Sequence, residues 1–235
     1  MKKSITQADI TVIWQYQKAV RSLMYIMLQT CSDITFTVFT VSQFAQNLNT
    51  SHYNAVKRIF KYLVSTMNLD VIYDITDNSL ISYTDADWGD CHNIRKFTEA
   101  YLFLLYEGLI SWCSKRQQFV TLFLMKAEYM AETQAMKEAI WLCRFLSEIG
   151  YFHDDNVVII WADNNKAMNL ARNPEFYACI KHINIQYHFV CEAVNHHLVD
   201  FEFVPIIKQA ADGLTKALFA VKFSRFLIQS GLIFN

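Results

Sequence analysis

The stretch from Ile81 to Gly89, which reads ISYTDADWG, most constrains how this chain can fold. Apolar and polar residues alternate up to Asp85, and a second carboxylate, Asp87, follows where a half-buried strand is expected to end. A carboxylate in such a place costs several kcal/mol unless something pairs with it, and a metal ion is a natural partner. The pattern therefore predicts a strand that carries an acid to a cation site at the edge of a sheet.

Two further acids stand in similar settings downstream. Glu128 begins a row of residues three and four apart on a long predicted helix, and Asp163 directly follows the apolar run VVIIWA. The helical row continues through Ala131, Ala135, Ala139, Leu142 and Leu146. Its three alanines would let the helix lie close to a sheet and bring Glu128 to the strand ends.

Each of these acids also has a plainer interpretation. Glu128 at a helix start is favoured by the helix dipole, and Asp163 can cap the helix that follows it. The same holds for a fourth acid, Asp212 in KQAADGLTK. Together the four form a more specific pattern, because oxygen-donor acids that converge at one edge suit two hard divalent cations, Mg²⁺ or Mn²⁺. Such a pair can hold both the attacking water and the leaving oxygen of a phosphodiester displacement.

Composition restricts the class of protein. A hydrophobic share of 53% with 2 prolines in 235 residues predicts a folded chain with a sizeable core. The net charge of -1 provides no overall attraction to a polyanion, so contacts to nucleic acid must come from local clusters. Six scattered cysteines without a CxxC, and a start without a signal-peptide pattern, predict free thiols and an intracellular location, cytoplasmic or nuclear. The apolar stretches are too short for a membrane span.

The hydrophobic pattern of the sequence changes near residue 75. Residues 1–75 have helical periodicity, with Asp33 and Ser51 as candidate helix caps, and residues 76–235 mix strands with helices. Gly150 is expected to end the long helix in a left-handed conformation. The fold class predicted is α/β, with a mixed five-stranded sheet covered by helices and preceded by a small helical segment. The expected strands are 81–89, 100–106, 109–113, 157–162 and 198–204, and the expected helices of this part are 124–149, 164–173, 180–196 and those from 210 onward.

Several segments, in order, carry a resemblance to a known family. They are ISYTDADWGDC, RKFTEAYLFLL, LISWCSKRQ, MKAEYMAETQAMKEAIWLCRFL, WADNNKAMNLARNP, KHINIQYHFV and FVPIIKQAADGLTKAL. In this order they resemble the RNase H domain at the end of copia-type retrotransposon Pol polyproteins. The earlier SLMYIMLQTCSDITFTV and AVKRIFKYLVSTMNLDVIY resemble the connecting segment between polymerase and RNase H in the same polyproteins.

The resemblance implies a function. It implies an RNase H fold in which Asp85, Glu128, Asp163 and Asp212 hold two Mg²⁺ or Mn²⁺ ions. The implied reaction is hydrolysis of the RNA strand of an RNA:DNA hybrid, leaving a 3′-hydroxyl and a 5′-phosphate. The family pattern places the metal on Asp85, with Asp87 as its competitor.

Contacts to the hybrid are expected from basic, amide and aromatic side chains that read phosphates and 2′-hydroxyls without sequence specificity. The plainer interpretation of each basic pair is a solvated loop. The residues are Trp88, Arg95, Lys96, Lys115, Arg116, Gln117 and, from a family motif, His182.

Some positions depart from the family pattern. Large apolar residues occupy 122–125 before Glu128, and Gly213 follows Asp212 where a bulkier aliphatic residue is usual, which is expected to loosen that helix start. The alternative is therefore a non-catalytic, degenerate or domesticated retrotransposon fragment that keeps the fold and at most binds nucleic acid weakly. The polymerase aspartates are absent, so no DNA synthesis is expected, and the missing polymerase part of Pol is a candidate partner.

Overall fold

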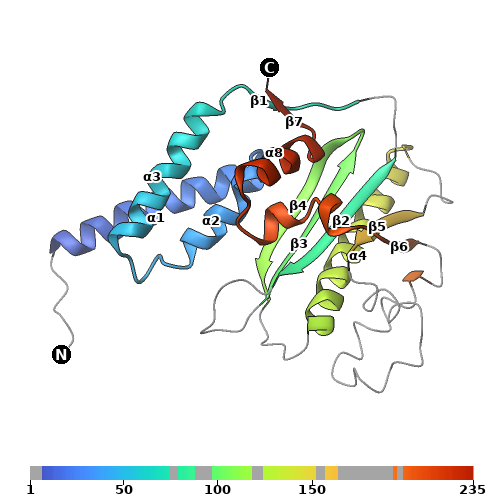
Figure 1. Cartoon of the computed structure of the whole chain (residues 1–235), viewed down its shortest axis with the longest axis horizontal. Coiled ribbons are helices and arrows are strands. Elements are labelled where there is room, and N and C mark those ends of the chain that lie inside the picture. Colours follow the sequence, from blue (N-terminus) through green and yellow to red (C-terminus); the bar gives the residue numbers. More distant parts are fainter. Residues whose placement is uncertain are drawn as a thin grey trace. The chain divides into compact units, whose positions relative to one another are not determined.

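The computed structural model describes residues 7–74, 79–87, 97–117, 124–151, 157–163, 193–194 and 198–234 (Figure 1). The chain divides into two compact units, Met1–Asp70 with Phe234–Asn235, and Val71–Ile233. This division lies near the boundary expected from the sequence at residue 75. The assignment of the first unit to a polymerase connection stays a prediction.

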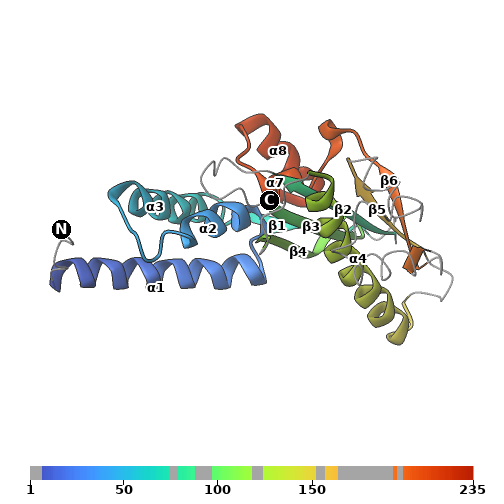
Figure 2. The same ribbon diagram turned by 90° about the horizontal axis from the view of Figure 1, so that it is seen from below.

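The first unit is helical. It contains α1 (Gln7–Gln29), the 3-10 turn η1 (Ser32–Ile34), α2 (Thr35–Ser42) and α3 (Thr50–Ser65). Figure 2 shows α1 running alongside α2 and α3. The buried residues of α1 recur at steps of three and four, as an amphipathic helix requires, and pack against apolar residues of the other two helices. This core contains Tyr16, Val20, Leu23, Met27, Val38, Val41, Val56 and Ile59.

Both helix caps expected in this unit are wrong. Helix α3 is capped by Asn49, whose Oδ1 accepts from the His52 backbone N–H at 3.1 Å, while His52 Nδ1 accepts from the Asn49 N–H at 3.3 Å. Ser51 instead donates its hydroxyl to Asn49 Oδ1. Asp33 lies inside η1 and accepts a hydrogen bond of 2.6 Å from the Tyr62 hydroxyl, so its carboxylate joins this turn to α3 and does not cap α2.

The second unit is built on a mixed sheet. The chain enters it through β1 (Leu69–Val71), and the five main strands are β2 (Leu80–Asp87), β3 (Thr98–Leu105), β4 (Gly108–Arg116), β5 (Val158–Ala162) and β6 (Val199–Phe203). They lie in the order β4-β3-β2-β5-β6, with β2, β3 and β4 antiparallel and β2, β5 and β6 parallel. The predicted mixed five-stranded sheet, covered by helices and preceded by a helical segment, is confirmed.

The turn between β3 and β4 contains two residues in the left-handed region that are not glycines. Its left-handed residues are Tyr106 and Glu107, with φ of 55° and 60°. Gly108 begins β4, and a β-carbon there would collide with the Tyr73 ring. This glycine is required by the close approach of Tyr73, not by the turn itself.

Helix α4 (Leu124–Glu148) covers one face of the sheet. The row predicted from the sequence is its buried face, since Ala131, Ala135 and Ala139 are almost fully buried against β2, β3 and β5. As expected, the helix ends at Gly150 with φ of 75°, where the Gly150 and Tyr151 N–H groups bond to the carbonyls of Ser147 and Leu146.

The other face of the sheet is covered by the C-terminal elements, on the side opposite α4 (Figure 2). They are η4 (Ile206–Lys208), α7 (Asp212–Thr215) and α8 (Ala220–Gln229), after which the chain forms the short strand β7 (Leu232–Phe234). Gly213 is buried beneath the Phe226 ring of α8, which occupies the space that a larger side chain at 213 would need. A side chain larger than glycine at position 213 would therefore collide with the Phe226 ring.

Most of the helices expected over 164–173 and 180–196 lies outside the described residues. Ala193 and Val194, which the structure does describe, are helical. No helix in the described ranges is long and apolar enough to cross a membrane.

Candidate metal centre

Two neighbouring parallel strands bring the first two acids together. Asp85 lies near the end of β2 and is only 4% exposed, and Asp163 directly follows β5. Strands β2 and β5 are parallel, with Ile81 opposite Ile159 and Tyr83 opposite Trp161. Because parallel strands end at the same edge of a sheet, both carboxylates reach this edge.

Helix α4 supplies the third acid. The Glu128 carboxylate accepts a hydrogen bond from the Ala86 backbone N–H, which joins the start of α4 to β2. Asp85, Glu128 and Asp163 each offer one carboxylate oxygen, and these three oxygens all lie within 4.8 Å of one another. The convergence expected from the sequence is found for these three acids. Asp87 does not join this group among the described residues, so of the competing aspartates it is Asp85 that does.

Asp212 stands beside the three acids, held by a lysine. It opens α7, is 5% exposed, and its Oδ1 lies 2.6 Å from Lys216 Nζ. The same ammonium lies 4.0 Å from Asp85 Oδ2, which also accepts the Thr215 hydroxyl. The fourth predicted acid is thus adjacent to the cluster and shares a counter-charge with Asp85.

Burial and mutual repulsion raise the pKa values of Asp85, Glu128 and Asp163. Burial, with repulsion from Asp212 and Asp163, raises the pKa of Asp85 to about 7 despite the opposing effects of Lys216 and Thr215. Burial, followed by the charges of Asp85, Asp163 and Glu132, raises the pKa of Glu128 to about 9. The pKa of Asp163 is raised mainly by burial and then by Asp212. Ionised together, these acids repel one another strongly.

The donor set fits a hard divalent cation. The three converging groups are all carboxylates, and oxygen donors of this kind are what Mg²⁺ and Mn²⁺ prefer. Lys216 supplies one positive charge to Asp85 and Asp212 and also acts on Asp163, which leaves Glu128 without a counter-charge in the described part of the chain. A bound cation would relieve this repulsion.

One acid close to the cluster was not predicted from the sequence. Glu132 follows Glu128 by one helical turn, is 1% exposed, and its charge raises the pKa of Glu128. The spacing of four residues on α4 was the available signal, because it places both carboxylates on one face of the helix.

The expected hybrid-contact residues fall into two groups. Trp88, Arg95, Lys96 and His182 lie outside the described residues. Lys115 is exposed on β4, and Arg116 is partly exposed at its end. Gln117 is 2% exposed, and its amide donates to the Ala127 carbonyl at 2.8 Å, so the structure places it as a link between β4 and α4.

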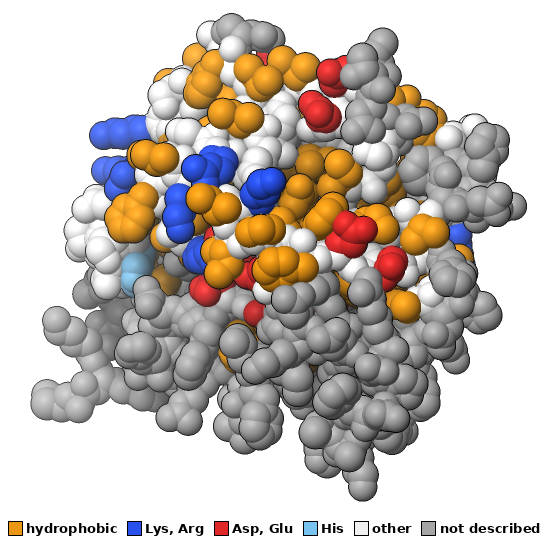
Figure 3. Space-filling model, turned by 45° about the vertical axis from the view of Figure 1, so that its right-hand side comes forward, with side chains coloured by type: hydrophobic (Ala, Val, Ile, Leu, Met, Phe, Trp, Pro, Cys, Tyr) orange, Lys and Arg blue, Asp and Glu red, His pale blue; other side chains and the backbone are white. Residues whose placement is uncertain are grey.

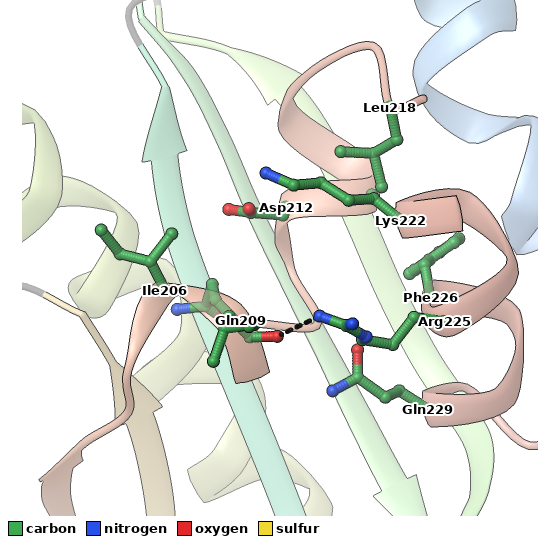
Figure 4. Close-up of a pocket in the computed structure, with 10 residues that line it drawn as sticks. Ile206, Gln209, Asp212, Leu218, Lys222, Arg225, Phe226 and Gln229 are labelled. Atoms are coloured by element: carbon green, nitrogen blue, oxygen red, sulfur yellow. Dashed lines mark hydrogen bonds between the residues drawn. The ribbon is translucent and has the colours of Figure 1, made fainter. Parts of the chain in front are cut away.

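A groove next to Asp212 adds basic groups that the sequence analysis did not single out. It lies between η4, α7 and α8 and is open to solvent, and its empty space of about 320 Å³ includes part of that solvent. Arg225 donates to the Ile207 carbonyl at 3.2 Å, and in Figure 4 Lys222 extends toward the side of the groove that holds Asp212. Figure 3 shows basic side chains gathered close to acidic ones on one face, with apolar side chains between them.

The Lys216 ammonium should contribute most to the stability of the protein when no metal is bound. Replacing Lys216 with methionine leaves Asp212 and Asp85 without their counter-charge, so we expect the free energy of unfolding of the metal-free protein to fall by about 1–2 kcal/mol at pH 8. Excess Mg²⁺ should restore most of this loss. Urea unfolding with and without Mg²⁺ measures both effects, with Lys208→Met, a change at an exposed lysine, as the control. Equal losses in the two variants would contradict the assigned role.

Comparison with known proteins relates the chain to a family. No protein-family model matches the chain. A Pol polyprotein from transposon TNT 1-94 of Nicotiana tabacum is 40% identical over 209 residues, which cover 88% of this chain. A second Pol polyprotein, from transposon RE2 of Arabidopsis thaliana, is 33% identical over 220 residues, or 93% of this chain. The chain belongs to the retrovirus-related Pol polyproteins of transposons.

The Pol relatives are much longer than this Pol-related chain, which spans only 16% and 15% of their lengths. Among solved structures, the chain is similar to LC11-RNase H1 in complex with an RNA/DNA hybrid. The TM-score is 0.42 and the identity 17%, with 58% of this chain and 94% of that chain covered. The Pol relationship agrees with the resemblance inferred from the sequence motifs.

Proposed function

We propose that the second unit is a metal-dependent ribonuclease H that hydrolyses the RNA strand of RNA:DNA hybrids. The observation that carries this proposal is the meeting of Asp85, Glu128 and Asp163, buried or partly buried acids from three separate elements, with oxygens within 4.8 Å of one another. Asp212 lies next to them. Such a cluster is costly without a cation and has the ligand chemistry for one.

In this proposal two Mg²⁺ or Mn²⁺ ions are held by Asp85, Glu128, Asp163 and Asp212. When bound, such ions stabilise the attacking and leaving oxygens of a phosphodiester and lower the pKa of the attacking water. The chain fixes the geometry, because Asp85 and Asp163 sit on paired strands and Glu128 is tied to β2 through the Ala86 N–H. The products would carry a 3′-hydroxyl and a 5′-phosphate.

The proposed substrate is the RNA:DNA hybrid, as the Pol relationship and the motif resemblance suggest. Its phosphates would meet Lys115 on β4 and the basic wall of the groove beside Asp212, where Lys222 and Arg225 lie. We also propose that the chain acts inside the cell and together with the polymerase part of a Pol protein.

The decisive experiment is cleavage of a hybrid labelled on the RNA strand, with Mg²⁺ or with EDTA, by the wild-type chain and by Asp163→Asn. We expect cleavage that requires Mg²⁺, is lost in the variant, and leaves single-stranded RNA and double-stranded DNA intact. Absence of metal-dependent cleavage at high protein concentration would reject the proposal.

A second candidate is a non-catalytic chain that keeps the fold and binds nucleic acid weakly. The Lys216 ammonium favours it, since a lysine 2.6 Å from Asp212 and 4.0 Å from Asp85 neutralises part of the cluster without any metal. Hybrid binding without cleavage in the experiment above would favour this candidate.

The groove should contribute to hybrid affinity. Replacing Lys222 with glutamate removes a phosphate contact, so we expect the dissociation constant to rise by about tenfold and the salt dependence of binding to decrease by about one counterion. Fluorescence anisotropy of a labelled hybrid over a range of salt concentrations measures both. Arg144→Glu, an exposed change on α4 across the sheet, is the control, and an equal effect there would remove the groove from the binding surface.

A further inference from the structure

Glu132 is a buried acid that no described interaction satisfies. Its side chain is 1% exposed, and neither Oε1 nor Oε2 has a hydrogen-bond partner among the described residues. Its neighbours on the helix, Ala131, Thr133 and Met136, are buried as well. Buried polar groups are nearly always paired, so an acid in this state needs a physical reason.

The position of Glu132 relates it to the acid cluster. It follows Glu128 by one turn of α4, and its charge acts on Glu128. The charge that acts on Glu132 itself is that of Asp163, an acid of the same sign. No positive group among the described residues is recorded beside Glu132, whereas Asp85 and Asp212 share Lys216. The Glu128 side of the cluster therefore carries excess negative charge.

We propose that Glu132 is a further anionic residue of the cation site, acting on the side formed by Glu128 and Asp163. This inference rests on the proposed function, because it requires that the acid cluster binds divalent cations. Glu132 is outside the group of three acids whose oxygens lie within 4.8 Å of one another, so it acts from next to that group. Lys216 already offsets part of the charge of Asp85 and Asp212, whereas the charge of Glu132 adds to that of Glu128 and would be offset by the bound cations.

Two substitutions separate this role from that of an inert buried acid. Glu132→Gln removes the charge at nearly constant shape, and Glu132→Leu removes the unpaired polar group altogether. We expect both to weaken Mn²⁺ binding at least tenfold. We also expect Glu132→Leu to raise the melting temperature of the metal-free protein and to reduce the further rise produced by Mg²⁺. Glu148→Gln, at the exposed end of the same helix, is the matched control and should bind Mn²⁺ like the wild type.

The measurements are Mn²⁺ titration followed by electron paramagnetic resonance, and thermal unfolding with and without Mg²⁺, both on the full chain. Mn²⁺ affinities within twofold of the wild type in both Glu132 variants would overturn the inference, as would a wild-type chain that binds no Mn²⁺. Mn²⁺ binding that depends on Glu132 and Asp163, in a chain that does not cleave hybrid, would support the inference while rejecting the proposed activity.

Discussion

Replacing Asp85 with asparagine is expected to lower hybrid cleavage at least ~10³-fold while making the metal-free protein more stable at pH 8. The first effect follows from the loss of an ionised oxygen donor that the proposed cation site needs. The second follows from burial and from repulsion by Asp212 and Asp163, which raise the pKa of Asp85 to about 7 and so disfavour its charged form. One side chain would thus cost stability and supply function.

The expected gain is of the order of 1–3 kcal/mol in the free energy of unfolding. It is smaller than the full pKa difference implies, because the Asp85 carboxylate also accepts from Thr215 and lies near Lys216, and asparagine keeps only part of these contacts. Urea unfolding in EDTA measures the stability, and the labelled-hybrid assay measures the rate. A loss of stability in Asp85→Asn, in place of the expected gain, would show that Lys216 and Thr215 compensate the buried charge of Asp85.

Asp87→Asn is the internal control for this experiment. Asp87 lies two residues further along the same strand and does not join the three acids whose oxygens converge. We expect cleavage by this variant to stay within about tenfold of the wild type. A loss as large as that of Asp85→Asn would reverse the assignment between the two aspartates of the pair.

The sequence predicted those parts of the fold that depend on local patterns. The alternation in β2, the alanine row of α4 and the left-handed Gly150 each follow from the residues of one element. The convergence of Asp85 and Asp163 needed one more step, the common edge of two parallel strands. Periodicity identifies strands, and their pairing then determines where their ends lie.

The errors share a different cause. Ser51 and Asp33 are residue types that often cap helices. In this structure Asn49 accepts the hydrogen bond from the His52 N–H at the start of α3, and the Asp33 carboxylate accepts one from the Tyr62 hydroxyl instead. Gln117 was expected to contact nucleic acid, but its amide donates to the Ala127 carbonyl of α4. In each case the partner comes from the three-dimensional packing or from a competing neighbour, which residue type alone does not specify.

The same reason explains the two charged residues that the sequence left unnoticed at the site. Lys216 lies four residues after Asp212, and Glu132 four after Glu128, spacings that are common on ordinary solvent-exposed helices. Their importance comes from burial, since Glu132 itself is buried and the partly exposed Lys216 contacts two buried carboxylates, Asp85 and Asp212. Burial of a single side chain is a property of the whole unit.

The stability of the metal-free protein should fall as pH rises from about 5 to 9, and Mg²⁺ should remove most of this fall. The pKa of Asp85 is raised to about 7 and that of Glu128 to about 9, from ordinary values of 3.8 and 4.5. Between the ordinary and the raised values the folded state binds more protons than the unfolded state. The free energy of unfolding therefore decreases with rising pH, by up to about 1.4 kcal/mol per pH unit for each group.

Thermal unfolding in EDTA at pH 5, 7 and 9 measures this dependence, and we expect the melting temperature to drop by roughly 5 °C or more over the range. A cation binds the ionised acids, so its own affinity rises with pH and offsets their repulsion. The difference between the Mg²⁺ and EDTA curves should consequently widen toward pH 9, and Asp85→Asn should flatten the EDTA curve. Parallel curves for the two conditions would mean that the cation does not bind at these acids, and the physical basis for a metal-dependent nuclease at this sheet edge would be lost.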